Sequence, residues 1–459
     1  MRAQRKRENS VKIMLMVALY RILLVLLMTA GLWVCVGQGL SVADWSVVLL
    51  SYIFLMLLLQ KIYGACSAGY GGISELILSQ TLSNLIDMGV IYVCLSLYAH
   101  RFLNLLPMMS VFAAQENLGV VWSIAVNRIY CKNYVPPRTA IVYRSDAVLD
   151  MICQSPYFDK KYDIIKLIKD PADDIDILKN ELRDCDAVFA ADISAELVDG
   201  IAMYCADKKV KGFIVPSLGH IVLSGAKYKT RFSVPMLLVE RGGKRSFYRA
   251  FKRAFDVAAS LGGIVLTMPI MLITAMLIYL EDRGPVIYRQ TRLTRNGREF
   301  EILKFRSMRV NAEQDGVARL ASQNDSRITK IGQFIRTCRI DELPQLFNIL
   351  KGDMSIVGPR PERPEIAEQY EAELPEFALR LQVKAGLTGM AQIYGRYNTD
   401  PYHKLQMDLM YINEMSLMTD LMLIMKTMKI LFVKESTAGI KTGQITAIAD
   451  NNAKAHETA

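Results

Sequence analysis

The chain has 459 residues, of which 52% are hydrophobic, and its formal net charge is +10. High hydrophobicity together with positive charge indicates a membrane protein that faces anionic lipid or phosphate, and it argues against a nucleic-acid-binding protein. The eight cysteines form no CxxC pair and there are four histidines, so a zinc site is not expected. The cysteines are interpreted as small apolar side chains in a reduced compartment.

Residues 1–130 contain four apolar stretches, over 13–36, 45–59, 77–97 and 102–125. About 20 apolar residues cross the hydrocarbon core of a bilayer, so the sequence predicts a transmembrane anchor of four helices.

Charged residues near these stretches predict their orientation. Basic residues cluster before the first stretch and after the fourth, so the positive-inside rule places the N-terminus and everything after residue 127 in the cytoplasm. Asp87 and Glu116 interrupt the third and fourth stretches and are costly in lipid. We expect them to face neighbouring helices; a transport route is the alternative.

Between residues 137 and 240, short strand-like runs alternate with segments of helical spacing, which is typical of a parallel sheet of the Rossmann kind. The first run is followed by Arg144, Ser145 and Asp146 instead of a glycine-rich turn, so the phosphate-binding loop is absent. We predict a Rossmann-like α/β domain with a structural or regulatory role, and nucleotide binding stays the alternative.

Residues 245–283 carry a basic collar and an apolar stretch long enough to span a bilayer. The basic residues, expected to attract anionic lipid, are Arg241, Lys244, Arg245, Arg249, Lys252 and Arg253. Arginines follow the stretch as densely as basic residues precede it, and Pro269 near its middle cannot donate a helical hydrogen bond. We predict a re-entrant membrane helix that kinks at Pro269 and returns to the cytoplasmic side; a straight fifth span is the alternative.

A hairpin is predicted after this helix, with Asn296 and Gly297 in its turn. Lys304 and Arg306 share one face of its second strand, where they could grip a diphosphate or simply be solvated. A polar loop is expected over 310–324, and the small, polar residues 441–459 are expected to be a disordered tail.

Asp341 and Glu342 stand side by side just before Pro344, which suits the first turn of a helix. Adjacent carboxylates at a helix N-terminus, with Arg336 and Arg360 nearby in sequence, indicate magnesium and a phosphorylated substrate. An ordinary acidic first turn with solvated arginines is the alternative.

From about residue 249 to 436 the chain resembles the bacterial sugar transferase family, the polyprenyl-phosphate phosphoglycosyl transferases. The resemblance rests on FKRAFDV, the proline-containing helix, GPVIYRQ, KFRSM, DELPQLFNILKGDMSIVGPRP, GLTGMAQIYGR and the DLMY segment. The four predicted spans and the glycine-poor α/β domain resemble the large members, which make the first lipid-linked sugar of capsule or exopolysaccharide.

The resemblance implies a mainly helical catalytic domain over 284–440. It implies that Asp341 is the nucleophile and Glu342 its dyad partner, and we assign Asp341 as the magnesium ligand. The positions that match the family's substrate, phosphate or metal residues are Lys304, Arg336, Arg360 and Asp408. Two departures concern loop shape and sugar choice: Ala385 replaces a usual proline, and Arg339 takes a place often held by Ser or Thr.

The implied reaction moves a sugar-1-phosphate from a UDP-sugar to polyprenyl phosphate through an aspartyl-phosphosugar, with release of UMP. It would occur at the bacterial inner membrane, with the catalytic domain in the cytoplasm. A carboxylate can attack a diphosphate if magnesium and arginines screen the repulsion between the anions. The alternatives are a membrane glycosyltransferase that releases UDP and an inactive scaffold for polysaccharide assembly. A homo-oligomer is a further hypothesis, and no motif names the sugar.

Overall fold

The computed structural model describes residues 2–36, 42–67, 72–153, 158–171, 174–231, 234–239, 246–309, 327–395 and 400–430. The predicted loop at 310–324, the predicted tail at 441–459 and the collar residues 241–245 lie outside this described part. The chain divides into two compact units, Met1–Pro216 and Ser217–Ala459.

The first unit begins with four long helices, α1 (Arg2–Val36), α2 (Val42–Tyr63), α3 (Ile73–Tyr98) and α4 (Leu105–Asn133). Their core includes every fourth residue of α1 from Tyr20 to Leu32, because this spacing brings side chains to one face of a helix. By length and composition all four helices could cross a membrane, and so could α10 of the second unit.

The acidic residues Asp87 of α3 and Glu116 of α4 face the interior of the bundle. Glu116 accepts hydrogen bonds from Thr81 at 2.5 Å and from Asn84 at 2.9 Å. The side chain of Asp87 is also buried. This confirms the expectation that both residues face neighbouring helices.

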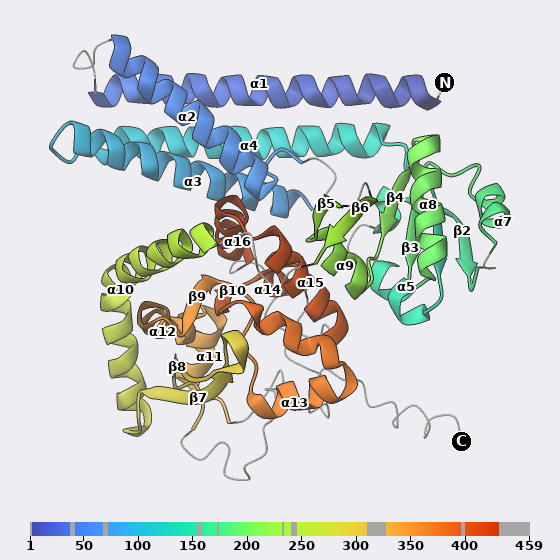
Figure 1. The fold of residues 1–459 in the computed structure, drawn as a ribbon. Helices are drawn as coiled ribbons and strands as arrows, with labels where there is room; N and C mark the ends of the chain where they lie inside the picture. Colours follow the sequence, from blue (N-terminus) through green and yellow to red (C-terminus); the bar gives the residue numbers. More distant parts are fainter. Residues whose placement is uncertain are drawn as a thin grey trace. The chain divides into compact units, whose positions relative to one another are not determined.

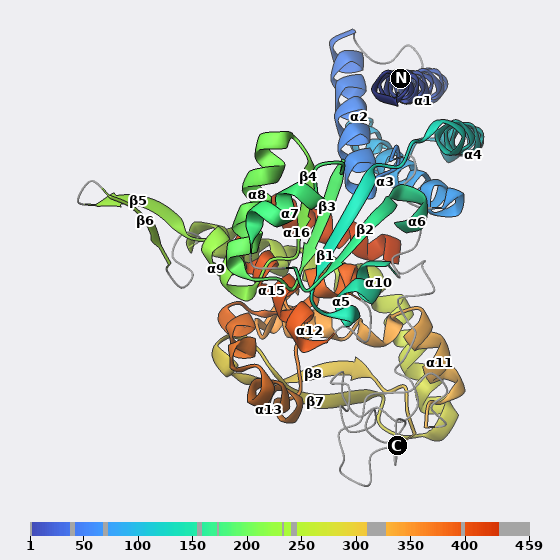
Figure 2. The ribbon, with the colours of Figure 1, turned by 90° about the vertical axis from the view of Figure 1, so that its right-hand side faces the viewer.

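An α/β module follows, and Figure 2 shows its sheet. Its four parallel strands lie in the order β2-β1-β3-β4. The strands are β1 (Arg138–Tyr143), β2 (Asp163–Lys169), β3 (Ala187–Ala191) and β4 (Lys211–Ile214), and the helices are α5 (Asp146–Cys153), α6 (Phe158–Lys161), α7 (Ile175–Glu181) and α8 (Ala195–Lys208). Alternate residues of β1 pack on opposite faces, Val142 with Leu178 and Leu197, and Ile141 with Phe158. The predicted parallel sheet is confirmed, and the turn after β1 leads into α5 without a glycine.

The second unit begins with α9 (Leu218–Ser224) and the hairpin of β5 (Lys227–Arg231) and β6 (Val234–Leu238). The sequence pattern predicts that these residues belong to the α/β domain over 137–240. The structure places the boundary after Pro216, because Ile221 of α9 packs in a core with Phe377 and Leu405.

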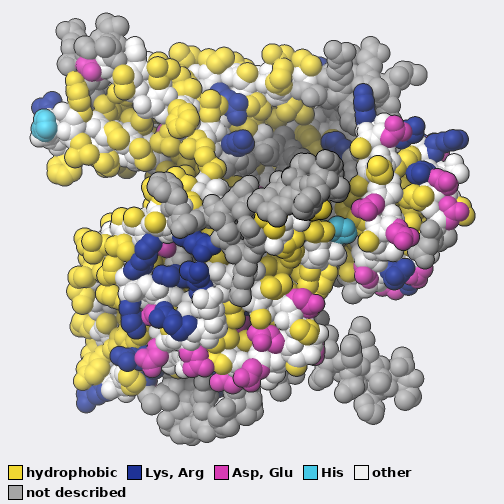
Figure 3. All heavy atoms as spheres, viewed as in Figure 1, with side chains coloured by type: hydrophobic (Ala, Val, Ile, Leu, Met, Phe, Trp, Pro, Cys, Tyr) yellow, Lys and Arg dark blue, Asp and Glu magenta, His cyan; other side chains and the backbone are white. Residues whose placement is uncertain are grey.

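Helix α10 (Ser246–Asp282) runs along one side of the second unit, and Figure 1 shows that it bends sharply partway along its length. Pro269 lies inside it, and an internal proline is a common cause of a kink. Its exposed apolar side chains form a continuous margin in Figure 3 and include Leu261, Val265, Leu266, Met268, Ile270, Leu272, Ile273, Met276, Leu277 and Leu280. An apolar surface of this kind is typical of contact with lipid or another protein.

The rest of the unit contains short elements around two paired sheets. The antiparallel hairpin β7 (Ile287–Leu293) and β8 (Glu299–Phe305) was predicted, and its turn residues Asn296 and Gly297 have positive φ angles of 61° and 73°. The strands β9 (Met354–Val357) and β10 (Ala385–Thr388) pair in parallel. The helices are α11 (Lys330–Thr337), α12 (Gln345–Lys351), α13 (Pro364–Glu373), α14 (Met390–Tyr394), α15 (Pro401–Glu414) and α16 (Leu417–Ile430), and the 3₁₀ turns are η2 (Arg295–Gly297), η3 (Ile340–Glu342) and η4 (Pro375–Gln382).

Part of the predicted basic collar is used inside this unit. Lys252 of α10 forms an ion pair with the buried Asp420 at 2.5 Å. Arg253 donates hydrogen bonds to the carbonyls of Ile349 and Leu350 at the end of α12, which lack helical partners. These two cations therefore tie α10 to α16 and α12, and their binding to anionic lipid stays a prediction.

The close approach of Gly358 and Gly386 gives a test of the fold. A Cβ atom on Gly386 would lie 2.1 Å from the backbone N of Gly358. We therefore expect Gly386→Ala to destabilise the second unit by about 1–3 kcal/mol, as overpacking does. Calorimetry of the full chain in detergent measures the change. Gly262→Ala is the matched control, because a Cβ there meets open space, and equal stability of the two variants would contradict the described packing.

Candidate functional site

The two adjacent carboxylates lie in η3, between α11 and α12. Arg339, just before the turn, has a left-handed backbone conformation with a φ of 57°. On either side of the pair, Ile340 and Leu343 pack on a core that contains Ile335 of α11. The apolar neighbours therefore anchor the turn, and Asp341 and Glu342 are held in a fixed position.

Three cations surround one oxygen of Glu342, whose side chain is 13% exposed. Its Oε1 lies 3.3 Å from Nζ of Lys304, 3.2 Å from Arg360 and 3.7 Å from Arg339. Burial alone would raise the pKa of Glu342, but these cations outweigh burial and hold the pKa well below its usual range. Glu342 is therefore an ionised carboxylate at neutral pH, with its Oε1 engaged by three cations.

Asp341 has a different environment, although it is the next residue. It is 9% exposed, and its Oδ1 has no hydrogen-bond partner among the described residues. Burial raises the pKa of Asp341, and the charge of Glu342 adds to this effect, whereas Lys304 and Arg336 oppose it. An uncommitted carboxylate oxygen beside cations can act as a nucleophile or as a metal ligand.

The residues present fit a magnesium ion whose coordination shell is completed by phosphates of the substrate. Within the described ranges, no group of three or more His, Cys, Asp or Glu side chains could hold a metal alone. Magnesium in phosphoryl-transfer sites commonly uses one or two carboxylates together with substrate phosphates and water. The unpartnered Oδ1 of Asp341 matches such a ligand.

The structure brings most of the predicted binding residues to the dyad. Lys304 and Arg360 contact Glu342, and Arg336 lies close enough to lower the pKa of Asp341. Arg306 instead forms an ion pair with Asp282 at the end of α10. Asp408 is bound to Arg380 at 2.7 Å and is 1% exposed. A direct role for Arg306 or Asp408 in binding substrate stays a prediction.

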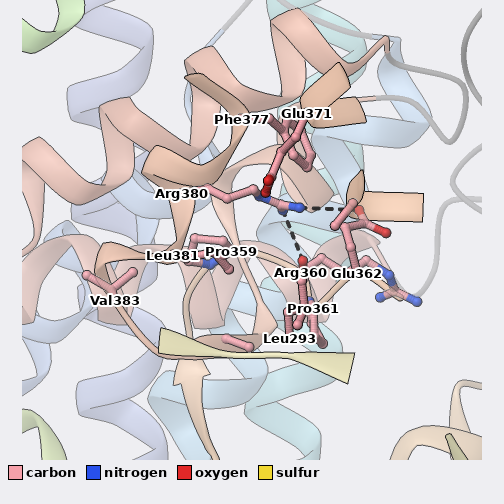
Figure 4. Close-up of a pocket in the computed structure, with 12 residues that line it drawn as sticks. Leu293, Pro359, Arg360, Pro361, Glu362, Glu371, Phe377, Arg380, Leu381 and Val383 are labelled. Atoms are coloured by element: carbon pink, nitrogen blue, oxygen red, sulfur yellow. Dashed lines mark hydrogen bonds and ion pairs between the residues drawn. The ribbon is translucent and has the colours of Figure 1, made fainter. Parts of the chain in front are cut away.

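A buried charge cluster behind the Arg360 loop was not assigned from the sequence. Figure 4 shows Arg380 directed toward the loop and bonded to the carbonyl of Arg360 and to Glu362. The ion pair of Glu362 with Lys404, together with Arg380, outweighs burial and lowers the pKa of Glu362 to about 2. Arg292 donates to the carbonyl of Pro361 at 3.0 Å, and burial lowers the pKa of Arg292 to about 10. The sequence signal for Arg380 is a charged residue between the apolar Leu379 and Leu381.

Comparison with known proteins finds relatives of this chain. A family model described as bacterial sugar transferase matches residues 247–434. The UDP-N-acetylgalactosamine-undecaprenyl-phosphate N-acetylgalactosaminephosphotransferase of Aeromonas hydrophila is 44% identical over 185 residues, which cover 40% of this chain and 44% of that protein. The UDP-glucose:undecaprenyl-phosphate glucose-1-phosphate transferase of Escherichia coli K12 is 36% identical over 245 residues, which cover 51% of this chain and 53% of that protein.

The matched region thus spans about half the length of these two curated relatives. It spans 71% of the UDP-glucose:undecaprenyl-phosphate glucose-1-phosphate transferase of Caulobacter vibrioides, which is 40% identical over 190 residues and matches 40% of this chain. The family model covers the dyad and the cations that surround it. The chain belongs to the bacterial sugar transferase family.

Proposed function

We propose that this protein transfers a sugar-1-phosphate from a UDP-sugar to undecaprenyl phosphate or a similar polyprenyl phosphate and releases UMP, as the first step in building a lipid-linked glycan such as capsule or exopolysaccharide. The names of the relatives support the two substrate classes. The observation that carries the proposal is the asymmetry of the dyad. Three cations lie within 4 Å of Oε1 of Glu342, whereas Asp341 keeps a buried oxygen without a partner among the described residues.

In the first step, an oxygen of Asp341 attacks the sugar-linked phosphorus of the UDP-sugar. The bond from this phosphorus to the bridging oxygen breaks, and that oxygen leaves with UMP. Lys304, Arg336 and Arg360 lower the repulsion between the carboxylate and the diphosphate. A bound magnesium ion would supply further positive charge to the phosphate oxygens.

In the second step, a phosphate oxygen of the lipid attacks the same phosphorus. The bond to Asp341 breaks, its carboxylate is restored, and the sugar becomes linked to the lipid through a diphosphate. One phosphoanhydride has then been exchanged for another through a mixed anhydride. Glu342 stays ionised throughout and holds Lys304 and Arg360 against the reacting phosphate groups.

The proposed reaction needs a lipid substrate at the dyad, and the position of α10 next to the dyad supports this part of the proposal. Its second half contributes Ile278 to the apolar core on which Ile340 and Leu343, the neighbours of the dyad, also pack. We propose that α10 enters the inner membrane, bends at Pro269 and leaves on the same side, with the catalytic unit in the cytoplasm. The dyad would then be within reach of a lipid head group and of a cytosolic nucleotide sugar.

Substitution of the proposed nucleophile tests the chemistry. Asp341→Asn should lower turnover on the order of 10³-fold or more, as loss of a catalytic nucleophile does. With UDP-sugar and magnesium but no lipid acceptor, intact-mass measurement should show a sugar-phosphate adduct on the unsubstituted chain and none on this variant. Asp199→Asn in the α/β module is the control. Unchanged turnover of Asp341→Asn would refute the assignment.

The dependence of activity on pH provides a second test. Asp341 must be ionised to attack, so kcat/KM should fall as the pH drops through its raised pKa. Arg336 opposes the rise in that pKa, so Arg336→Gln should move the acidic limb to higher pH. Arg289→Gln is the control, because Arg289 is exposed and pairs with Glu301. An acidic limb that stays in place in Arg336→Gln would contradict the role of Asp341.

The orientation of the catalytic unit can be measured at Cys338, which is exposed and close to Asp341 in sequence. In a variant that keeps Cys338 as its only cysteine, an impermeant maleimide should label inverted vesicles and leave intact cells unlabelled. A thiol introduced by Gly39→Cys is the positive control in intact cells, because residue 39 lies between the first two predicted spans and a cytoplasmic N-terminus places it outside. Labelling of Cys338 in intact cells would show that α10 crosses the membrane.

A further inference from the structure

The loop Gly358–Glu362 brings Arg360 to Glu342, and its backbone is bonded to other elements of the unit. Two of its five residues, Pro359 and Pro361, have no N–H group to donate. Four of its five carbonyls accept hydrogen bonds from donors outside the loop. Pro359 O accepts from Gly386 N at 2.8 Å, Arg360 O from Arg380 at 2.9 Å, Pro361 O from Arg292 at 3.0 Å and Glu362 O from Leu293 N at 3.0 Å.

Arg380 is the donor whose own position is determined most fully. Its side chain is 3% exposed, and both Nε and Nη2 bond to Asp408 of α15, at 2.8 Å and 2.7 Å. Its Nη1 lies 3.4 Å from Glu362, and the ring of Phe377 packs 4.8 Å from its guanidinium carbon. A buried guanidinium needs such partners to offset the loss of water.

Asp408 in turn has little access to a substrate. It is 1% exposed, and Arg380 engages its Oδ2 through two nitrogens. Figure 4 shows the Arg380 guanidinium between its own helical turn and the loop, with its bonds directed to Arg360 and Glu362. Asp408, Arg380 and the carbonyl of Arg360 thus form a continuous chain of contacts that ends at the dyad.

We infer that Arg380, oriented by Asp408, is a positioning residue that sets the guanidinium of Arg360 against Glu342. This inference rests on the proposed function, because it assigns Arg360 to phosphate chemistry at the dyad. Asp408 acts through Arg380 and does not touch the sugar nucleotide. The contact of Arg380 with the Arg360 carbonyl matters because carbonyls of the proline-rich loop accept hydrogen bonds from donors that other elements supply.

Loss of this contact has a consequence beyond stability. Arg360 lies 3.2 Å from Oε1 of Glu342, beside the carboxylate that would react. If Arg360 withdraws, phosphate binding in the reacting state weakens, and a displacement of about 1 Å can cost on the order of 10²-fold in rate. A loss of rate that arises in this way requires Arg360 to be present. A loss of rate that arises from general destabilisation of the fold does not.

The test compares two buried aspartates of the full-length protein. Asp408→Asn removes the charge that orients Arg380, and Asp420→Asn removes the charge that pairs with Lys252. Both aspartates are at most 2% exposed. Asp420 also contacts Tyr411, which bonds to the carbonyl of Val357, so this control perturbs the strand that precedes the loop without touching Arg380.

Activity is measured for each variant alone and combined with Arg360→Gln. Asp408→Asn should lower kcat/KM on the order of 10-fold to 100-fold in the unsubstituted background. In the Arg360→Gln background, Asp408→Asn should lower kcat/KM by less than about twofold, because the two changes remove the same interaction. Asp420→Asn should lower kcat/KM by the same factor in both backgrounds. An equal factor for Asp408→Asn in both backgrounds would overturn the inference.

Hydrogen exchange of the amides of Gly386 and Leu293, which donate to the loop carbonyls of Pro359 and Glu362, gives a readout that needs no activity. Exchange should accelerate in Asp408→Asn and not in Asp420→Asn; unchanged exchange would overturn the inference. If exchange accelerates while Asp341→Asn keeps full turnover, the proposed function fails and the positioning contact stands. Arg380→Lys covers the case in which Asp408→Asn fails to fold, because one ammonium keeps the charge but cannot serve Asp408, Glu362 and the Arg360 carbonyl together. It should show the same loss and the same dependence on Arg360.

Discussion

Two neighbouring carboxylates in a buried turn are the constraint on which the catalytic unit depends. Adjacent like charges oppose each other's ionisation, and burial adds to the cost. Cations from separate elements offset this cost: Lys304 from the hairpin, Arg339 from the turn and Arg360 from the proline-rich loop. They engage Glu342, which leaves Asp341 with the raised pKa and the open oxygen. The division of roles follows from environment, since both groups are carboxylates.

The turn η3, which carries the dyad, also connects the proposed chemistry to the apolar helix α10. Ile340 and Leu343 lie on either side of the dyad in sequence, and both pack on the core that includes Ile278 of α10. On its other faces α10 exposes large apolar side chains. One helix therefore offers a surface suited to lipid and supports the residues that would react with a lipid phosphate. The first unit supplies four more apolar helices and an α/β module without a glycine-rich phosphate loop.

Much of this was readable from sequence where the signal is local. The Asn296-Gly297 turn predicted the hairpin, strand-helix alternation predicted the parallel sheet, and the carboxylate pair before Pro344 predicted the dyad. Contacts between distant segments were not readable. Arg380 and Asp408 are 28 residues apart, and Arg292 reaches a carbonyl 69 residues away. Nothing near Lys252 in sequence indicated that Asp420 would bind it, and nothing near Ile221 indicated that α9 would join the second unit.

The central claim is that the sugar moves together with its phosphate. A membrane glycosyltransferase would transfer the sugar alone and release UDP, and an inactive scaffold would release no nucleotide. The direct measurement is chromatography of the nucleotide released when the purified full-length protein is incubated with magnesium, polyprenyl phosphate and a panel of UDP-sugars. The account predicts UMP in amounts equal to the lipid-linked sugar formed; UDP as the released nucleotide would contradict it.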